Sequence, residues 1–328
     1  MIFIRPLDHH YMKIHPFAAV LMISFLSFCS SPKDDTTRNE MSIAYNVLFD
    51  AESDNYEVFT MDLQGSDKKN ITNLAGVEWA YLAFKNRLFF ISDKDTLARC
   101  FFLYETDYQG SKKRKVSDIR LADSWMSTRF DGQEMIVKPH RIVDSAFYII
   151  NTTSGNLLQR LETGLPFAND PLFVNKGTQV IFRGGNKKSK RDQGFLDELY
   201  RINSDGTDLV QLTHYPKDDT TAKWYDYHAG PPRLHPTENF ITYQSYQQGK
   251  YSLYVITNDG SRNWKLTDLP YNEGWHDWSA DGNWLAIEIF DNDQTQFHIG
   301  LMNWKTRNFT FLTDSTHKYQ QAPVFVLK

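Results

Sequence analysis

The stretch ITNDGSRNWKLTD, residues 256–268, has the pattern of a strand, a tight turn and a second strand. The turn signal is Asn258-Asp259-Gly260, because these residue types tolerate the positive φ values that tight hairpin turns require. Apolar residues alternate before the turn, and Trp264 and Leu266 continue the alternation after it. Related hairpins occur at five other places in the chain. The stretch is therefore one copy of an internal repeat, and the repeat period determines the fold.

The hairpin copies end at regular intervals along the chain. Their last residues are Thr72, Ser117, Glu162, Thr213, Thr267 and Thr313, at spacings of 45, 45, 51, 54 and 46 residues. A second hairpin lies between successive copies, most clearly in DWSADGNWLAIEI at residues 277–289. Two hairpins in about 45 residues make four short strands per repeat, which is the composition of a β-propeller blade.

The two ends of the chain complement each other. The first copy begins at Ile43 with no strand before it, whereas residues 322–327 match a first strand with no hairpin after it. Pairing of these segments would complete one blade and close the ring without an open edge. We therefore predict an all-β fold for residues 43–328: a six-bladed β-propeller with four-stranded blades, closed by the C-terminal strand pairing into blade one.

Two of the repeated phrases resemble the TolB-type propeller repeat. They are Trp278-Ser279-Ala280-Asp281-Gly282, and Asn258-Asp259-Gly260-Ser261 followed by Leu266-Thr267. The resemblance covers residues 43–328 and implies the six-bladed fold. It also implies one possible role, an envelope scaffold that works with partner proteins.

The N-terminus has the features of an export signal. An apolar run of 13 residues, Pro16 to Phe28, is too short to span a bilayer. Together with Cys29, it resembles a bacterial lipoprotein signal. The resemblance implies a signal peptide at residues 1–28, lipidation of Cys29, a polar tether at residues 29–42 and anchoring in the outer membrane. The following SSPKDD resembles the export tag of surface-exposed lipoproteins. The alternative is an ordinary cleaved signal with an unmodified cysteine.

Composition excludes several functional classes. The chain has 36 basic and 40 acidic residues, a net charge of −4, which does not favour nucleic acid as a partner. Cys100 is the only cysteine besides Cys29, so the mature chain cannot form an intramolecular disulfide. The sequence contains no Gly-x-Ser-x-Gly nucleophile motif, phosphate-binding loop or dinucleotide fingerprint.

One connection between blades is unusually long. Five connections take 8 to 10 residues, whereas the one from Thr213 to Pro232 takes 19. The insertion contains Trp224, Tyr227 and His228, and irregular aromatic loops on a rigid scaffold commonly form binding sites. We expect this loop to overhang the channel mouth and to place these three residues near Trp275 and His276. The alternative is a loop whose aromatic side chains only pack on the propeller.

Further candidates fall in the connections that lead to the channel mouth. Trp79, Trp125 and Trp275 share one register, and Asp170, His276, Asp277 and Gln320 lie at neighbouring positions of the repeat. Aromatic rings beside carboxylates and amides suit a glycan or a protein segment, which they would bind by stacking and hydrogen bonding. The alternative is that the tryptophans are structural wedges between blades.

The histidines raise the possibility of a metal enzyme. His228, His276 and His317 come from three mouth connections and could together bind a divalent metal. Oligogalacturonate lyases are similar in fold and hold a metal with His and Gln, but their compact Gln-x-x-His-x-His group is missing here. We therefore expect a lipid-anchored binding protein of the cell envelope without a cofactor. A metal-assisted polysaccharide lyase and a TolB-like scaffold are the alternatives.

Overall fold

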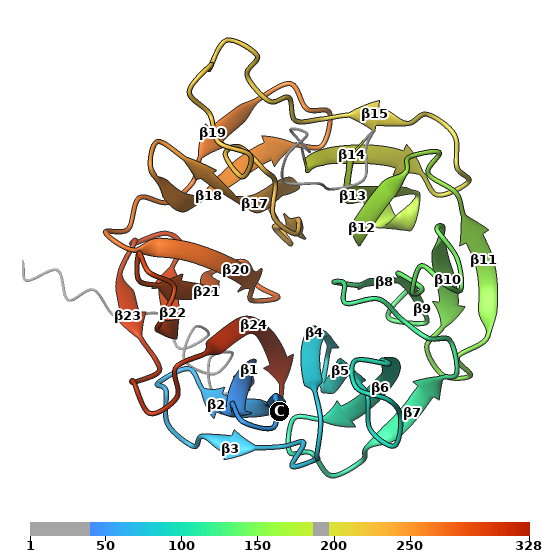
Figure 1. The fold of residues 1–328 in the computed structure, drawn as a ribbon, viewed down its shortest axis with the longest axis vertical. Coiled ribbons are helices and arrows are strands. Elements are labelled where there is room, and N and C mark those ends of the chain that lie inside the picture. The colour runs from blue at the N-terminus through green and yellow to red at the C-terminus, as the bar shows by residue number, and fades with distance from the viewer. Residues whose placement is uncertain (1–39, 186–196) are drawn as a thin grey trace, which may run out of the picture.

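The computed structural model describes residues 40–185 and 197–328, so the predicted signal peptide, Cys29 and most of the tether lie outside the described residues. The described strands form six antiparallel sheets of four strands each. The sheets are arranged as blades around a central channel (Figure 1). The prediction of a six-bladed propeller is thus confirmed.

The first three blades have the following strands, from the channel outward. Blade one consists of β24 (Gln320–Leu327), β1 (Met41–Asp50), β2 (Asn55–Asp62) and β3 (Lys69–Asn70). Blade two consists of β4 (Glu78–Phe84), β5 (Arg87–Ser92), β6 (Phe102–Asp107) and β7 (Arg114–Ser117). Blade three consists of β8 (Ser127–Arg129), β9 (Glu134–Val137), β10 (Phe147–Asn151) and β11 (Leu157–Leu161).

The other three blades follow the same order. Blade four consists of β12 (Phe167–Val174), β13 (Gln179–Gly185), β14 (Glu198–Asn203) and β15 (Val210–Gln211), with the short 3-10 helix η1 (Asn175–Gly177) between its first two strands. Blade five consists of β16 (Arg233–Leu234), β17 (Phe240–Gln247), β18 (Lys250–Thr257) and β19 (Asn263–Lys265). Blade six consists of β20 (Asn272–Trp278), β21 (Trp284–Phe290), β22 (Phe297–Asn303) and β23 (Phe309–Phe311).

Blade one is built from both ends of the described chain. The C-terminal strand β24 pairs antiparallel with β1, with Ser42 opposite Val326 and Ala44 opposite Val324. Val324 and Val326 are buried at the innermost edge of the blade. This pairing closes the ring as the two chain ends predict. The blade-one strand β1 begins at Met41, two residues before the expected start of the propeller.

The threonine that ends most of the hairpin copies has a structural role. The Oγ1 atoms of Thr72, Thr213, Thr267 and Thr313 accept hydrogen bonds from the backbone N–H groups of Val58, Leu199, Leu253 and Ile299. The first three also donate to a buried glutamate, which satisfies polar groups that would otherwise be buried without partners. The repeated Leu-Thr ending therefore fastens the outer strand to its blade.

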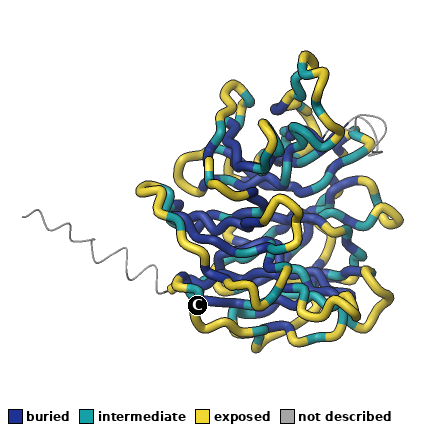
Figure 2. Tube along the Cα trace, turned by 60° about the vertical axis from the view of Figure 1, so that its left-hand side comes forward, coloured by how far each residue is buried: buried dark blue, intermediate teal, exposed yellow. Residues whose placement is uncertain are grey.

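The hydrophobic core lies within and between the blades. One cluster joins blades one and six through Ile43, Tyr45, Ile299 and Leu301, all buried. No blade buries both of its faces alone, so each depends on its neighbours. Figure 2 shows buried strands through the body of the molecule and exposed turns at its periphery.

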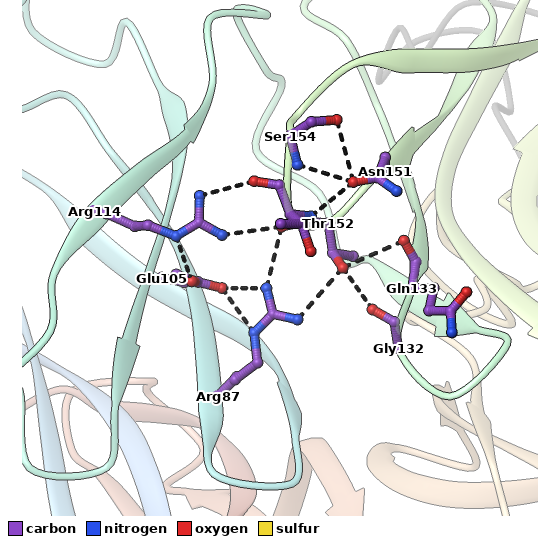
Figure 3. A network of polar contacts seen from close by, with 9 residues as sticks. Arg87, Glu105, Arg114, Gly132, Gln133, Asn151, Thr152 and Ser154 are labelled. Atoms are coloured by element: carbon purple, nitrogen blue, oxygen red, sulfur yellow. Dashed lines mark hydrogen bonds and ion pairs between the residues drawn. The ribbon is translucent and has the colours of Figure 1, made fainter.

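Charged side chains join blades two and three (Figure 3). Glu105 accepts hydrogen bonds from Arg87 at 2.9 Å and from Arg114 at 2.6 Å. Both arginines also donate to the carbonyl oxygen of Thr152 in blade three. The Thr152 hydroxyl donates in turn to the carbonyl oxygen of Gly132 at 2.6 Å. The network is a rigid junction between two blades.

Among the residues described, no helix is both long and apolar enough to cross a membrane.

Candidate functional site

The long connection between blades four and five does not bring Trp224 next to Trp275 at the channel mouth. It leaves β15, reaches the outer part of the ring and turns inward to β16 (yellow in Figure 1). Its return is fixed because the N–H groups of Tyr227 and Gly230 donate to the carbonyl oxygens of Tyr246 and Gln244. The expected cluster is divided: Trp224 lies in a surface groove, whereas Trp275 lies among the channel aromatics.

We name this groove the blade-five groove. It has a volume of about 620 Å³ and lies between blades five and six. It is on the face of the propeller that carries the channel mouth, where the connections between blades enter the innermost strands. We call this the upper face. Its lining consists of Trp224, Tyr225, Tyr246, Gly249, Tyr251, Asn272, Phe290, Asn292 and Gln294. The volume is within the range of sites that hold small organic ligands.

The groove combines aromatic rings with amide groups. Trp224 is 43% exposed, and Tyr225 packs edge-to-face against both Trp224 and Tyr246. Asn272 accepts the Tyr251 N–H and donates to Asn292 Oδ1 at 2.9 Å, which fixes the Asn292 amide. Asn292 and Gln294 are exposed. No charged side chain is among the described residues that line the groove.

Tyr227, predicted as a ligand-binding residue, is engaged within its own loop. Its hydroxyl donates to Asp219 at 2.7 Å, and its ring lies edge-to-face against Tyr215. The hydrogen bond to Asp219 raises the pKa of Tyr227 to about 12. Tyr227 therefore holds the loop in shape, whereas Trp224 presents an exposed surface to the groove.

Three predicted tryptophans do come together, inside the channel. The ring centroids of Trp79 and Trp125 lie 5.6 and 6.2 Å from that of Trp275, both in edge-to-face geometry. Trp125 is buried, and Trp79 and Trp275 are partly buried. Tyr81 packs on Trp125, and its hydroxyl donates to Asp123. The three predicted tryptophans therefore form one aromatic cluster across the channel, with the rings of Trp79 and Trp275 partly exposed.

Arg233, which the sequence analysis did not select, packs against this aromatic cluster inside the channel. Its guanidinium lies 3.6 Å from the ring centroid of Trp125. Its Nε donates to the His276 carbonyl oxygen at 3.1 Å, and Nη2 donates to the Tyr81 carbonyl oxygen at 3.2 Å. Burial lowers the pKa of Arg233 to about 10, so the side chain remains charged at neutral pH.

His276 and Asp277 point away from the groove. His276 is buried, and its Nε2 lies 2.7 Å from the hydroxyl of Thr242 in blade five. Burial and the charge of Arg233 lower the pKa of His276 to about 3, so the imidazole is neutral. Asp277 Oδ2 accepts the Phe325 N–H at 2.9 Å, and Oδ1 lies 3.8 Å from Arg233 Nε. Both residues have structural partners in neighbouring blades.

Asp170 and Gln320 are also buried and paired. Asp170 accepts the Trp125 N–H at 2.9 Å and forms an ion pair with Arg183 at 2.6 Å. Gln320 Nε2 donates to the carbonyl oxygen of His317 at 3.0 Å. A buried polar group with its partners already in place stabilises the fold. These two residues therefore lie beside the mouth as structural elements.

The three candidate metal ligands lie in different surroundings. His317 packs against Phe49 and Phe59 at the rim of blade one, whereas His276 faces Thr242. His228 lies near Asp197: burial raises the pKa of that carboxyl, and the charges of Arg183 and His228 oppose the rise. In the part of the chain that the structure describes, no three His, Cys, Asp or Glu side chains form a metal-binding group.

The sequence did not predict several groove residues, because they lie in hairpin turns within the blades and not in the connections between blades. Tyr246 and Tyr251 flank the turn between β17 and β18, and Asn292 and Gln294 lie in the loop between β21 and β22. A comparison of the connections that lead to the mouth cannot select them. The available signal was the aromatic pair on either side of one turn, in YQQGKY at residues 246–251.

Comparison with known proteins finds similarity at the level of structure. The sequence matches no protein-family model and no curated protein. TolB from Acinetobacter baumannii superposes with a TM-score of 0.65 at 14% identity, over 87% of this chain and 66% of that chain. A putative TolB from Agrobacterium tumefaciens gives 0.56 at 16% identity, over 84% of this chain and 89% of that one.

An enzyme is also among the structural neighbours. An oligogalacturonate lyase in complex with manganese gives a TM-score of 0.50 at 14% identity, over 84% of this chain and 74% of the lyase chain. At such identities the similarity concerns the fold and not the activity. The blade count, the four-stranded blades, the closure by the C-terminal strand and these superpositions agree, and the chain has a TolB-like six-bladed β-propeller fold.

Proposed function

We propose that this protein is a binding propeller of the cell envelope that holds a neutral glycan in the blade-five groove. The observation that supports the proposal is the lining of the groove: exposed Trp224 with three tyrosines, and the amides of Asn292 and Gln294 at its edge. Sugar rings present apolar C–H faces to aromatic rings and hydroxyl groups to amides. The groove offers both kinds of partner within one site.

The absence of charge in the groove lining favours a neutral ligand. An acidic polysaccharide would bring carboxylates that need cations or a metal to compensate them. The lining includes neither lysine nor arginine, and exposed Lys223 lies outside it, 5.7 Å from the ring centroid of Tyr225. This argues for a binding protein rather than for a lyase that acts on acidic sugars. A protein segment could also use aromatic rings, and the experiment below separates the two classes.

The test is binding of the purified protein to a panel of polysaccharides, with β-1,3-glucan, mannan and amylose as neutral members and polygalacturonate as the acidic member. We expect binding to a neutral member, and Trp224→Ala should weaken it roughly tenfold through loss of stacking. Trp264→Ala is the matched control, because Trp264 is 40% exposed and Trp224 43%, and Trp264 lies on the outer strand β19.

Other outcomes of the panel would redirect the assignment. Cleavage of polygalacturonate with unsaturated products would establish the lyase, and capture of peptides with no glycan binding would establish protein recognition. If Trp224→Ala and Trp264→Ala bind equally, the groove is not the site.

The envelope location rests on the N-terminal signal and on the fold shared with TolB. We propose that Cys29 carries the lipid anchor of an outer-membrane lipoprotein, displayed on the cell surface. A diacyl anchor supplies two chains, whereas a single chain binds membranes only marginally. Cys29→Ser should therefore release the protein from membranes. Retention of the variant after a salt wash would contradict the anchor.

A further inference from the structure

A second cavity lies at the end of the channel opposite the mouth, where the innermost strands of the blades end. We call this the lower end of the channel. The cavity has a volume of about 270 Å³ and is lined by the C-terminal parts of β4, β20 and β24 and by the turn after β20. The blade-five groove lies at the other end of the blades, because Asn272 at the start of β20 lines the groove and Trp278 at its end lines the cavity. The cavity is thus a separate site on the opposite face.

The walls of this cavity are mostly apolar. Val324, Val326 and Leu327 contribute from blade one, Leu82 and Phe84 from blade two, and Trp278 from blade six. A hydrocarbon chain or ring would lose water contact against these side chains, which favours binding of an apolar body. The volume restricts the ligand to a small molecule, since it lies near the lower limit for ligand sites.

One buried cation also lines the cavity. The Arg233 side chain is 8% exposed. Its Nε and Nη2 donate to carbonyl oxygens, and within the described residues no hydrogen bond is found for Nη1. The nearest carboxylate, Asp277, lies 3.8 Å from Nε, beyond hydrogen-bond distance, and its other oxygen accepts the Phe325 N–H. The guanidinium therefore retains donor capacity next to apolar walls.

A second cation lies at the edge of the cavity. Lys85 lines it and forms an exposed ion pair with Asp131 at 2.9 Å. An exposed pair of this kind contributes little stability and rearranges readily. Asp131 compensates the Lys85 charge, so the guanidinium of Arg233 is the group of the lining that would meet an anion in the cavity.

We propose that this lower-channel cavity binds a small amphipathic carboxylate, with its apolar chain against the β24 wall and its carboxylate on Arg233. A guanidinium donates to a carboxylate through a planar fork, and such charge-assisted hydrogen bonds are about twice as strong as neutral ones. The site is independent of glycan binding at the blade-five groove, and either proposal can fail without the other.

The test is titration calorimetry of the full mature protein with three probes of equal chain length: octanoate, octanol and octylammonium. We expect octanoate to bind about tenfold more tightly than octanol, since the apolar body is shared and only the carboxylate meets Arg233. Equal affinity of octanoate and octanol, or tightest binding of octylammonium, would overturn the proposal. Failure of octanoate to bind at millimolar concentration would do the same.

A steric variant locates the binding without disturbing Arg233. Ala280 is exposed and lines the cavity, so Ala280→Phe should obstruct it and weaken octanoate binding at least tenfold. Ala98→Phe makes the same change at an exposed position in the loop between β5 and β6, away from the cavity, and should leave affinity unchanged. Trp224→Ala should also leave it unchanged. If Ala280→Phe binds octanoate as wild type does, the cavity is not the site.

Discussion

The guanidinium of Arg233 lies 3.6 Å from the ring centroid of Trp125, so blade five contacts blade three across the channel. The same guanidinium donates to the carbonyl oxygens of His276 in blade six and Tyr81 in blade two. One side chain thereby connects four blades at the centre of the ring. Cation–π contacts of this kind are strongest when both partners are shielded from water.

Replacement of Arg233 should therefore destabilise the whole propeller. Arg233→Ala removes two buried hydrogen bonds and leaves Asp277 without its cation, and we expect a loss of about 3–5 kcal/mol of unfolding free energy. Urea unfolding measures it. Arg262→Ala is the control, because that guanidinium lies 5.8 Å from the exposed Trp264, and its loss should cost less than about 0.5 kcal/mol. Similar losses for both variants would show that the central contact is unimportant.

Glycine at position 155 is required by the close approach of two blades. Gly155 has φ +72°, and a Cβ atom there would lie 1.9 Å from the Val116 carbonyl oxygen of blade two. At Gly164, which has the same φ, an added Cβ atom would meet no atom of the described residues within 4 Å, apart from its chain neighbours. Gly164→Ala should cost about 1–2 kcal/mol from backbone strain alone. Gly155→Ala should cost at least about 2 kcal/mol more, because backbone must also move. Equal losses in thermal unfolding would refute the steric argument.

Closure of the ring should dominate stability. Deletion of residues 322–328 removes the buried side chains of Ala322, Val324, Phe325 and Val326 and exposes the edge of β1. At about 1.5–3 kcal/mol for each large side chain, we expect at least about 5 kcal/mol of lost stability and a tendency to aggregate. Deletion of residues 30–36 of the predicted tether is the control of equal length. An unchanged melting temperature after the C-terminal deletion would be incompatible with ring closure by β24.

The blade count and the closure could be predicted because their signals are local and repeated. A turn such as Asn258-Asp259-Gly260 determines its own hairpin, and six copies determine the ring. The shared blade one could be predicted because the first repeat lacks its innermost strand and residues 322–327 supply one strand too many at the other end. The Thr72 type of contact explains why a threonine recurs at the hairpin ends, since its hydroxyl accepts a strand N–H and reaches a buried glutamate.

The site could not be predicted to the same degree, because bulges interrupt the alternation of the inner strands. In β20 the pairing with β21 shifts between Glu273 and His276, and such a shift reverses which side chains face the channel. Consecutive side chains of a strand face opposite sides, so Trp275 packs on the channel aromatics while His276 faces Thr242, and the shift decides which of the two faces the channel. A set of mouth residues chosen by sequence position alone therefore contains side chains that face the channel and side chains that face a neighbouring blade.

One clear signal for the channel was present in the repeat. Alignment of RLHPTENF at 233–240 with DWSADGNW at 277–284 places Arg233 and Asp277 at the same repeat position in adjacent blades. Opposite charges at one position of neighbouring inner strands predict an ion pair across the blade boundary. The structure contains it, at 3.8 Å. The long connection was harder to place, because its path depends on hydrogen bonds to β17 that no local pattern encodes.

Glu288 should make stability depend on pH. Its carboxylate is buried beside the closing strand and accepts the Ala322 N–H at 3.0 Å, and burial raises its pKa from 4.5 to about 8. The folded protein therefore holds a proton that the unfolded chain releases above about pH 4.5. The stabilising contribution is fully present below that pH and is lost progressively as the pH rises through about 8.

Glu288→Gln isolates this effect from the other titrating groups, such as Glu78 and His276, whose contributions cancel in the difference between variant and wild type. The amide keeps an acceptor for the Ala322 N–H but carries no charge. We expect the two proteins to have similar unfolding free energies near pH 4 and the variant to be more stable by a few kcal/mol near pH 9. Denaturant titrations across this range measure the difference. A difference that does not change with pH, or one that favours the wild type in alkali, would show that Glu288 is ionised in the folded protein.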